Sequence, residues 1–147
     1  MKYQLAQLNL ARGKFPIDAS EMSGFTDNLD RINLLAEESP GFVWRLQTED
    51  GDATSIDYFG PDTIVNMSVW EDIESLHNYV YRSEHIKIMS RRKEWFHHFK
   101  EAYTVLWWIE KGRIPSLEES EQKIELLRSI GPTADAFTFK KAFPPPE

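Results

Sequence analysis

A histidine and an arginine in the second half of the chain have the spacing of a small-molecule site. His85 and Arg92 are seven residues apart, and on a helical wheel of about 100° per residue they share an arc with Met89 and Phe96. A charge in an apolar arc is costly unless it has a partner. The pattern therefore favours a cleft holding a partly polar ligand, with His85 as general base and Arg92 as anion-binding group. The alternative is structural, with both side chains satisfied by backbone carbonyls or a nearby glutamate.

A strand next to this segment offers further polar groups. Asn66 and Ser68 alternate with apolar residues over 64–70, so they point to one face of the strand. Asn66 joins His85 and Arg92 as the third candidate catalytic residue. The candidate ligand-binding residues are Trp44, Ser68, Trp70, Tyr81, Arg82, Met89, Trp95, Phe96 and Trp108. Because aromatic side chains dominate core packing, most of these aromatics are expected in the core, and some in a flat slot for a planar ligand.

Sequence periodicity and helix-stopping residues predict the strands and helices that carry these side chains. Alternating patterns predict strands, and apolar residues at helical spacing, with stop signals such as Ser39-Pro40-Gly41, predict helices. The expected strands are 3–10, 42–47, 64–70 and 104–110, with a short extended piece at 56–59. The expected helices lie before 39, from 71, from 84 through at least 96, and from 116 to 130. This is an α+β, ferredoxin-like βαββαβ order with an added C-terminal helix and extended arm.

The length of 147 residues fits one domain, with a core over about 1–131 and an arm over about 132–147. Two of the expected strands are apolar on both faces, although helices of a ferredoxin-like fold cover only one face of the sheet. In the second strand, Phe42, Trp44 and Leu46 oppose Val43. In the fourth, Leu106 and Trp108 oppose Val105, Trp107 and Ile109. Because exposed apolar faces mark contact surfaces, the pattern predicts a homodimer formed through the sheet faces.

Composition excludes several classes of function. The chain has no cysteine, which removes disulfides, thiolate zinc sites and cysteine nucleophiles. A net charge of −7 argues against general nucleic-acid binding, and no apolar run reaches the ~20 residues that cross a bilayer. No secretory signal is visible at the start, so we expect a soluble cytoplasmic protein.

The charge is unevenly distributed along the chain. Residues 1–80 carry a net charge of −9, whereas 82–100 carry +4. The cationic stretch favours an anionic or phenolic ligand, with a solvated helix face as the alternative. His97 and His98 are adjacent and diverge by at least about 100°, so they cannot serve one metal on a regular backbone, and no metal site is predicted.

Several stretches of the chain resemble a bacterial family of unknown function, family 3291. They are 69–76, 81–85, 91–96, 41–46, Trp107-Trp108 with Gly112 and Pro115, 131–133 and 136–139. The family resembles a branch of the dimeric α+β barrels, which include antibiotic-biosynthesis monooxygenases, haem-degrading monooxygenases and chlorite dismutase relatives. The resemblance implies that fold but no settled activity, because one fold hosts many functions.

By analogy with that superfamily, the protein is expected to act as a monooxygenase-like enzyme on an aromatic or polyketide-like molecule. His85 would take a proton from a phenol or enol, and Arg92 with Asn66 would stabilise the anion before O₂ attacks. No cofactor is required. Haem stays open through one axial histidine, with Arg82, Arg91 or Arg92 pairing the propionates. Two further functions stay open: a non-catalytic binding or sensing module that uses the same cleft and, least favoured, an RRM-like nucleic-acid binder.

Overall fold

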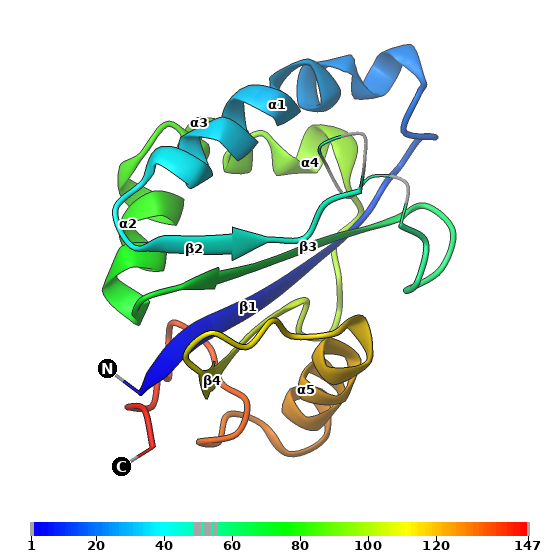
Figure 1. The fold of residues 1–147 in the computed structure, drawn as a ribbon. Helices are drawn as coiled ribbons and strands as arrows, with labels where there is room; N and C mark the ends of the chain where they lie inside the picture. The colour runs from blue at the N-terminus through cyan, green and yellow to red at the C-terminus, as the bar shows by residue number, and fades with distance from the viewer. Residues whose placement is uncertain (1, 49–50, 52–53, 55, 147) are drawn as a thin grey trace.

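The computed structural model describes residues 2–48, 51, 54 and 56–146. One antiparallel sheet has the strand order β2-β3-β1-β4. Its strands are β1 (Tyr3–Arg12), β2 (Phe42–Arg45), β3 (Thr63–Trp70) and β4 (Thr104–Glu110). The helices are a 3₁₀ turn (Ser20–Met22), α1 (Ser23–Glu38), α2 (Ile73–Arg82), α3 (His85–Met89), α4 (Arg92–Trp95) and α5 (Leu117–Ile130). Helices α1 to α4 lie on one side of the sheet and α5 on the other (Figure 1). The predicted element order is confirmed.

Local sequence signals explain several helix ends. The Asp72 carboxylate accepts a hydrogen bond from the Ser75 N–H at 2.8 Å and caps α2. The Ser116 hydroxyl accepts one from the Glu119 N–H at 3.0 Å and caps α5, which ends at Gly131 with a φ of +80°. Only glycine adopts such an angle readily, so the sequence punctuation and the observed helix ends agree.

Strand β2 differs from the simple alternation that the sequence predicts. The pairing with β3 shifts between Phe42 and Trp44, as a β-bulge does. A one-residue shift moves every following side chain to the other face. Phe42 therefore packs edge-on against Trp70 on the α1–α4 side, at 5.4 Å between ring centroids, while Trp44 packs into the core on the α5 side. The expectation that Phe42 and Trp44 share a face is wrong.

The helix expected from 84 through 96 is two short helices, α3 and α4. The Ser90 hydroxyl bonds back to the Lys87 carbonyl at 2.8 Å at the break. The second helix ends because the chain then pairs with β1: the His97 N–H donates to the Arg12 carbonyl at 2.9 Å and Phe96 forms a bridge with Gly13. Tertiary pairing thus overrides the helical periodicity.

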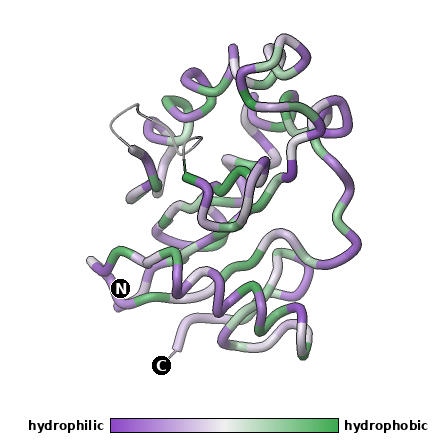
Figure 2. Tube along the Cα trace, turned by 90° about the vertical axis from the view of Figure 1, so that its right-hand side faces the viewer, coloured by the Kyte–Doolittle hydropathy of each residue, from purple (hydrophilic) through white to green (hydrophobic). Residues whose placement is uncertain are grey.

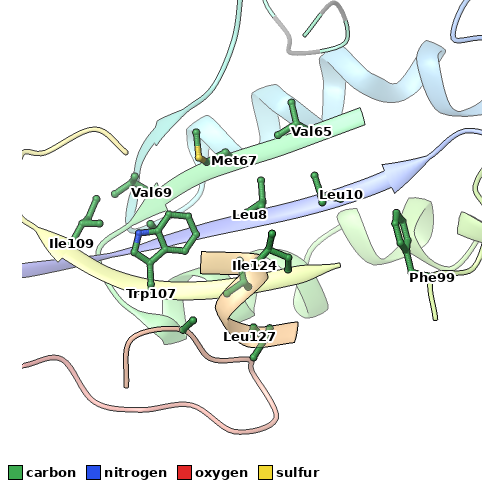
Figure 3. Close-up of a cluster of buried hydrophobic side chains, with 13 residues drawn as sticks. Leu8, Leu10, Val65, Met67, Val69, Phe99, Trp107, Ile109, Ile124 and Leu127 are labelled. Atoms are coloured by element: carbon green, nitrogen blue, oxygen red, sulfur yellow. The ribbon is translucent and has the colours of Figure 1, made fainter. Parts of the chain in front are cut away.

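The α5 side of the sheet carries the largest apolar cluster. Leu8, Met67 and Trp107 point from the strands toward Ile124 and Leu127 of α5 (Figure 3). The piece expected to be extended at 56–59 is instead a turn, closed by the Gly60 N–H and the Asp57 carbonyl at 2.9 Å. Its residues Ile56 and Phe59 pack against the same cluster.

The arm covers the other face of β4. Phe137 is fully buried and exchanges two 2.8 Å backbone hydrogen bonds with Leu106, and Phe143 packs beside it. The chain itself therefore covers the apolar faces of β4 that led to the expectation of a dimer. The homodimer stays a prediction, which light scattering would check against the mass of 17.2 kDa for one chain.

Hydrophobic and hydrophilic residues alternate over short distances along the trace (Figure 2). Within the described residues, no helix is long and apolar enough to cross a membrane.

Candidate functional site

A cavity of about 510 Å³ lies between the sheet and the helices α1 to α4. Its floor is formed by residues of β1 and β3 with Arg45 of β2 and Thr104 of β4, and its walls by side chains of the four helices. Such a volume falls within the range of small-molecule sites, about 300–1,000 Å³. The predicted cleft between the His85 segment and the sheet is therefore present.

On the α1–α4 face of the sheet, which includes the cavity floor, side chains lie in rows across the paired strands. Two neighbouring rows are mostly polar, and we call their polar residues the polar band: Thr104, Asn9 and Asn66 in one, and Gln7, Ser68 and Arg45 in the other, whose β4 member is the buried Leu106. An apolar row flanks the band on each side: Ala11 and Ile64 on one, and Leu5, Phe42, Trp70 and Trp108 on the other.

Hydrogen bonds fix the amide groups of the polar band. Gln7 Nε2 donates to Asn66 Oδ1 at 2.6 Å and to Ser68 Oγ at 2.9 Å, and Trp70 Nε1 donates to Ser68 Oγ at 2.8 Å. Asn66 Oδ1 is thereby occupied, and Asn66 Nδ2 has no partner within the described part of the chain. Two donors on Ser68 Oγ leave its own hydroxyl hydrogen free to donate. The floor thus keeps hydrogen-bond donors for a ligand oxygen.

His85 lines the cavity from the start of α3. Its Nδ1 lies 3.3 Å from the Val80 carbonyl oxygen, and its ring packs 4.9 Å from Tyr79, which stacks on Trp70. Burial lowers the pKa of the His85 imidazole below its ordinary value of 6.5, and the Val80 carbonyl opposes that shift. A neutral ring that donates from Nδ1 presents Nε2 as an acceptor, so His85 can accept a proton from a ligand.

Arg92 lines the cavity from α4. Its guanidinium donates to the Leu10 carbonyl at 3.2 Å and lies 4.5 Å from the Tyr103 ring centroid and 5.5 Å from that of Phe96. Desolvation lowers the pKa of Arg92, with Tyr103 acting in the opposite direction. Among the described residues no carboxylate pairs with Arg92. A half-buried cation held by one carbonyl and two rings retains donors for an anion.

Most of the residues predicted from the sequence lie at this cavity. They are Asn66, Ser68, Trp70, Tyr81, His85, Met89, Arg92, Trp95 and Phe96. Three predicted residues are elsewhere. Trp44 packs on the α5 side, Arg82 is exposed at the end of α2, and Trp108 donates to the Phe143 carbonyl at 2.9 Å in the arm cluster. The structure therefore does not bring these three to the cavity.

Further cavity residues were missed by the sequence reasoning. Gln7 and Asn9 alternate with leucines in β1 as Asn66 and Ser68 alternate with apolar residues in β3, and that repeated pattern could have revealed them. Phe139 gave no comparable signal, whereas Tyr79 belongs to the aromatics from which a flat slot was expected. Burial raises the pKa of Tyr79, and its hydroxyl donates to the Ile32 carbonyl at 3.1 Å, so it stays a neutral phenol.

The structure also shows where the residues considered for metal and haem binding lie relative to the cavity. No group of three or more histidine, aspartate or glutamate side chains in the described ranges is arranged to hold a metal ion. Of the three arginines considered for haem propionates, only Arg92 lines the cavity, since Arg91 is ion-paired with Glu94 at 2.8 Å and Arg82 is exposed. The haem alternative therefore depends on His85 and Arg92 alone.

Nearly the whole chain matches one protein family. A family model described as Domain of unknown function (DUF3291) matches residues 4–147. The chain belongs to this family. No curated protein gives a significant match.

Two solved structures are similar to this DUF3291 chain. The protein of unknown function NE2512 from Nitrosomonas europaea has a TM-score of 0.48 and 13% identity, covering 78% of this chain and 97% of that one. SnoaB, a cofactor-independent oxygenase from Streptomyces nogalater, has a TM-score of 0.43 and 14% identity, covering 80% and 98%. Likenesses at this level say nothing about the activity of this chain.

Proposed function

We propose that this protein binds a planar, largely apolar organic molecule with an acidic or anionic oxygen in the cavity between the sheet and helices α1 to α4. The observation that carries the proposal is the combination of a 510 Å³ cavity, aromatic walls and a polar band at its floor. Flat rings gain apolar burial and aromatic contacts from Phe25, Tyr79 and Trp95. The polar band and Arg92 then fix the orientation of the ligand.

The anionic oxygen of the ligand binds at Arg92. This cation lacks a carboxylate partner in the described residues and faces the cavity beside Tyr103. Asn66 Nδ2 supplies a neutral donor on the floor. A charge-assisted hydrogen bond to a ligand is worth about 1.5–3 kcal/mol, so Arg92 favours anions over neutral molecules of the same shape.

A second candidate function is catalysis on the bound molecule, as the monooxygenase-like expectation implies. One observation favours it: among the described residues His85 Nε2 has no partner, and the neutral imidazole lines the cavity. His85 would remove a proton from an enolisable carbon, and the carbanion would add O₂ to give a peroxide anion. The peroxide would take the proton back from His85, and the hydroperoxide would lose water to leave a carbonyl. A non-catalytic binding or sensing module uses the same cavity without this step.

Oxygen uptake with anthrone separates the two candidates. Oxidation of one anthrone by one O₂ gives one anthraquinone and one water, which absorbance and an oxygen electrode both follow. If the protein is catalytic, His85→Gln lowers the rate by roughly 10²- to 10⁴-fold and removes one limb of the pH profile. His97→Gln is the matched control, because His97 is exposed and lies outside the cavity.

Each outcome of that assay decides between the candidates. Binding of naphthalene-2-carboxylate without turnover of the three-ring anthrone, both in the parent and in Phe139→Ala, which enlarges the cavity, supports the binding function alone. Turnover that His85→Gln leaves unchanged overturns the role of His85 as base. A parent protein that neither binds naphthalene-2-carboxylate nor oxidises anthrone contradicts the proposed function itself. A visible spectrum after expression with haem available tests the haem alternative through the Soret band.

A further inference from the structure

The C-terminal arm reaches the cavity, although it follows the whole ferredoxin-like core in the sequence. Thr138, Phe139 and Lys140 line one end of the cavity, together with Val80 and Tyr81 of α2. We call this region the arm end. Helix α4 lies at the other end of the helical layer from α2 (Figure 1), and it contributes Arg92 and Trp95 to the lining.

Two anchors hold the arm on either side of the residues that reach the cavity. The first is Phe137, which is fully buried and exchanges two backbone hydrogen bonds with Leu106 of β4. The second is Phe143, whose carbonyl accepts a 2.9 Å hydrogen bond from Trp108 Nε1 and whose ring lies 5.9 Å from that of Phe137. The segment between the anchors is therefore a short loop with both ends fixed.

The loop itself has an internal restraint. The Lys141 N–H donates to Thr138 Oγ1 at 3.1 Å. The Phe139 ring meets His77 edge-on at 5.5 Å and Tyr81 at 5.8 Å between centroids. These side-chain contacts join the arm to α2 at the arm end. Phe139 is thus a half-buried side chain at the arm end, on a loop that is held at both of its ends.

We propose that Phe139 is a specificity-determining residue that forms the end wall of the cavity and limits the length of the ligand. The inference rests on the proposed binding function. With the anionic group of the ligand at Arg92 in the α4 end, the flat body of the ligand extends over the polar band toward the arm end. A ligand that is one ring too long meets Phe139, which cannot shift far because Phe137 and Phe143 hold the loop.

Two linear probes that differ by one fused ring measure this limit. Naphthalene-2-carboxylate has two rings and anthracene-2-carboxylate has three, and fluorescence titration gives both dissociation constants. We expect Phe139→Ala to improve the affinity for the three-ring probe relative to the two-ring probe by at least about tenfold, because about four extra apolar carbons become buried. Phe139→Leu is expected to give an intermediate ratio.

A matched control distinguishes removal of the end wall from a general loss of stability. Phe59→Ala removes another half-buried phenyl ring, but from the α5 side of the sheet and outside the cavity. It is expected to leave the ratio of the two dissociation constants unchanged within about twofold. If Phe139→Ala leaves the ratio unchanged while the parent binds the two-ring probe, Phe139 does not limit the ligand.

Thiol accessibility tests the wall without a ligand. Because the chain contains no cysteine, a single introduced thiol gives a background-free signal. Val80→Cys places it at the arm end and Ile88→Cys on α3, away from Phe139; both positions line the cavity. With dithionitrobenzoate, adding Phe139→Ala should accelerate labelling of Val80→Cys at least about tenfold and that of Ile88→Cys less than about twofold.

Negative results in the binding titrations and in the thiol labelling have different meanings. If the parent binds neither aromatic carboxylate, the proposed function fails, and labelling of Val80→Cys still decides whether Phe139 closes the cavity. If labelling of Val80→Cys is equally fast with and without Phe139, the end wall is overturned even where the parent binds the two-ring probe.

Discussion

The two faces of the sheet differ in what they bury. On the α5 side, neighbouring rows across the strands are wholly apolar, as in Val105, Leu8 and Met67, and α5 packs directly on them. On the α1–α4 side, the corresponding rows are the polar band, and a 510 Å³ cavity separates the band from the helices. The same three strands thus form a packed core on one face and a cavity floor on the other.

This difference indicates which face stabilises the fold and which is available for a ligand. An apolar row gains stability from contact with an apolar helix, whereas amides and hydroxyls lose water only at a cost unless each finds a partner. Gln7, Asn66 and Ser68 partly satisfy one another, and the remaining donors face the cavity. The polar band therefore favours a cavity that holds water or a ligand over close packing against the helices.

The largest expected effect comes from a matched pair of leucines on opposite faces. Leu8 is fully buried on the α5 side, and Leu29 is half-buried at the cavity wall. Leu8→Ala should lower the free energy of unfolding by about 2–5 kcal/mol, because it opens a new cavity in packed surroundings. Leu29→Ala should cost about 1 kcal/mol, because it enlarges an existing one. Equal losses in urea unfolding would show that the two faces are packed alike.

The next effect concerns the charge at the cavity. Arg92→Met keeps the apolar stem of the side chain and removes its cation. The affinity for naphthalene-2-carboxylate should fall by roughly 10- to 100-fold, and that for neutral 2-naphthol should change by less than about twofold. Arg91→Met is the control, since Arg91 pairs with Glu94 and is not part of the cavity lining. Unchanged affinity for the carboxylate in Arg92→Met would make Arg92 structural.

A smaller effect is expected from the pH dependence of stability. The pKa of His85 is lower in the folded state than its ordinary value because burial disfavours the imidazolium. The unfolded chain therefore binds this proton more readily, so stability falls as the pH drops through 6.5 toward the lower folded pKa. One proton limits the slope to about 1.4 kcal/mol per pH unit. Denaturation at several pH values should show a shallower slope in His85→Gln, and an identical slope would contradict the burial argument.

Much of the fold could be predicted because its signals are local. The alternation in 64–70 and 104–110 and the caps at Asp72 and Ser116 depend only on nearby residues, and these elements are present. The bulge at Phe42 and Trp44 and the end of α4 could not be predicted, because both depend on pairing with a strand distant in sequence. The cover that the arm gives to β4 is likewise a long-range contact.

The candidate site shows the same division. His85, Arg92 and Asn66 were found from their residue types on apolar faces, and all three line the cavity. Their roles in binding or catalysis stay predictions. Trp44 and Trp108 were chosen as large aromatics, and only tertiary packing distinguishes a core tryptophan from a cavity tryptophan. Phe139 could not be found at all, since nothing in the local sequence indicates that the arm returns to α2.

The central claim is that a planar organic anion binds on the α1–α4 side of the sheet. A crystal structure of the protein with naphthalene-2-carboxylate, at about ten times its dissociation constant, tests it most directly. We expect the rings to lie between the helices and the polar band, with a carboxylate oxygen about 2.9 Å from an Arg92 guanidinium nitrogen. Density for the probe outside this cavity, or only water within it, would contradict the account.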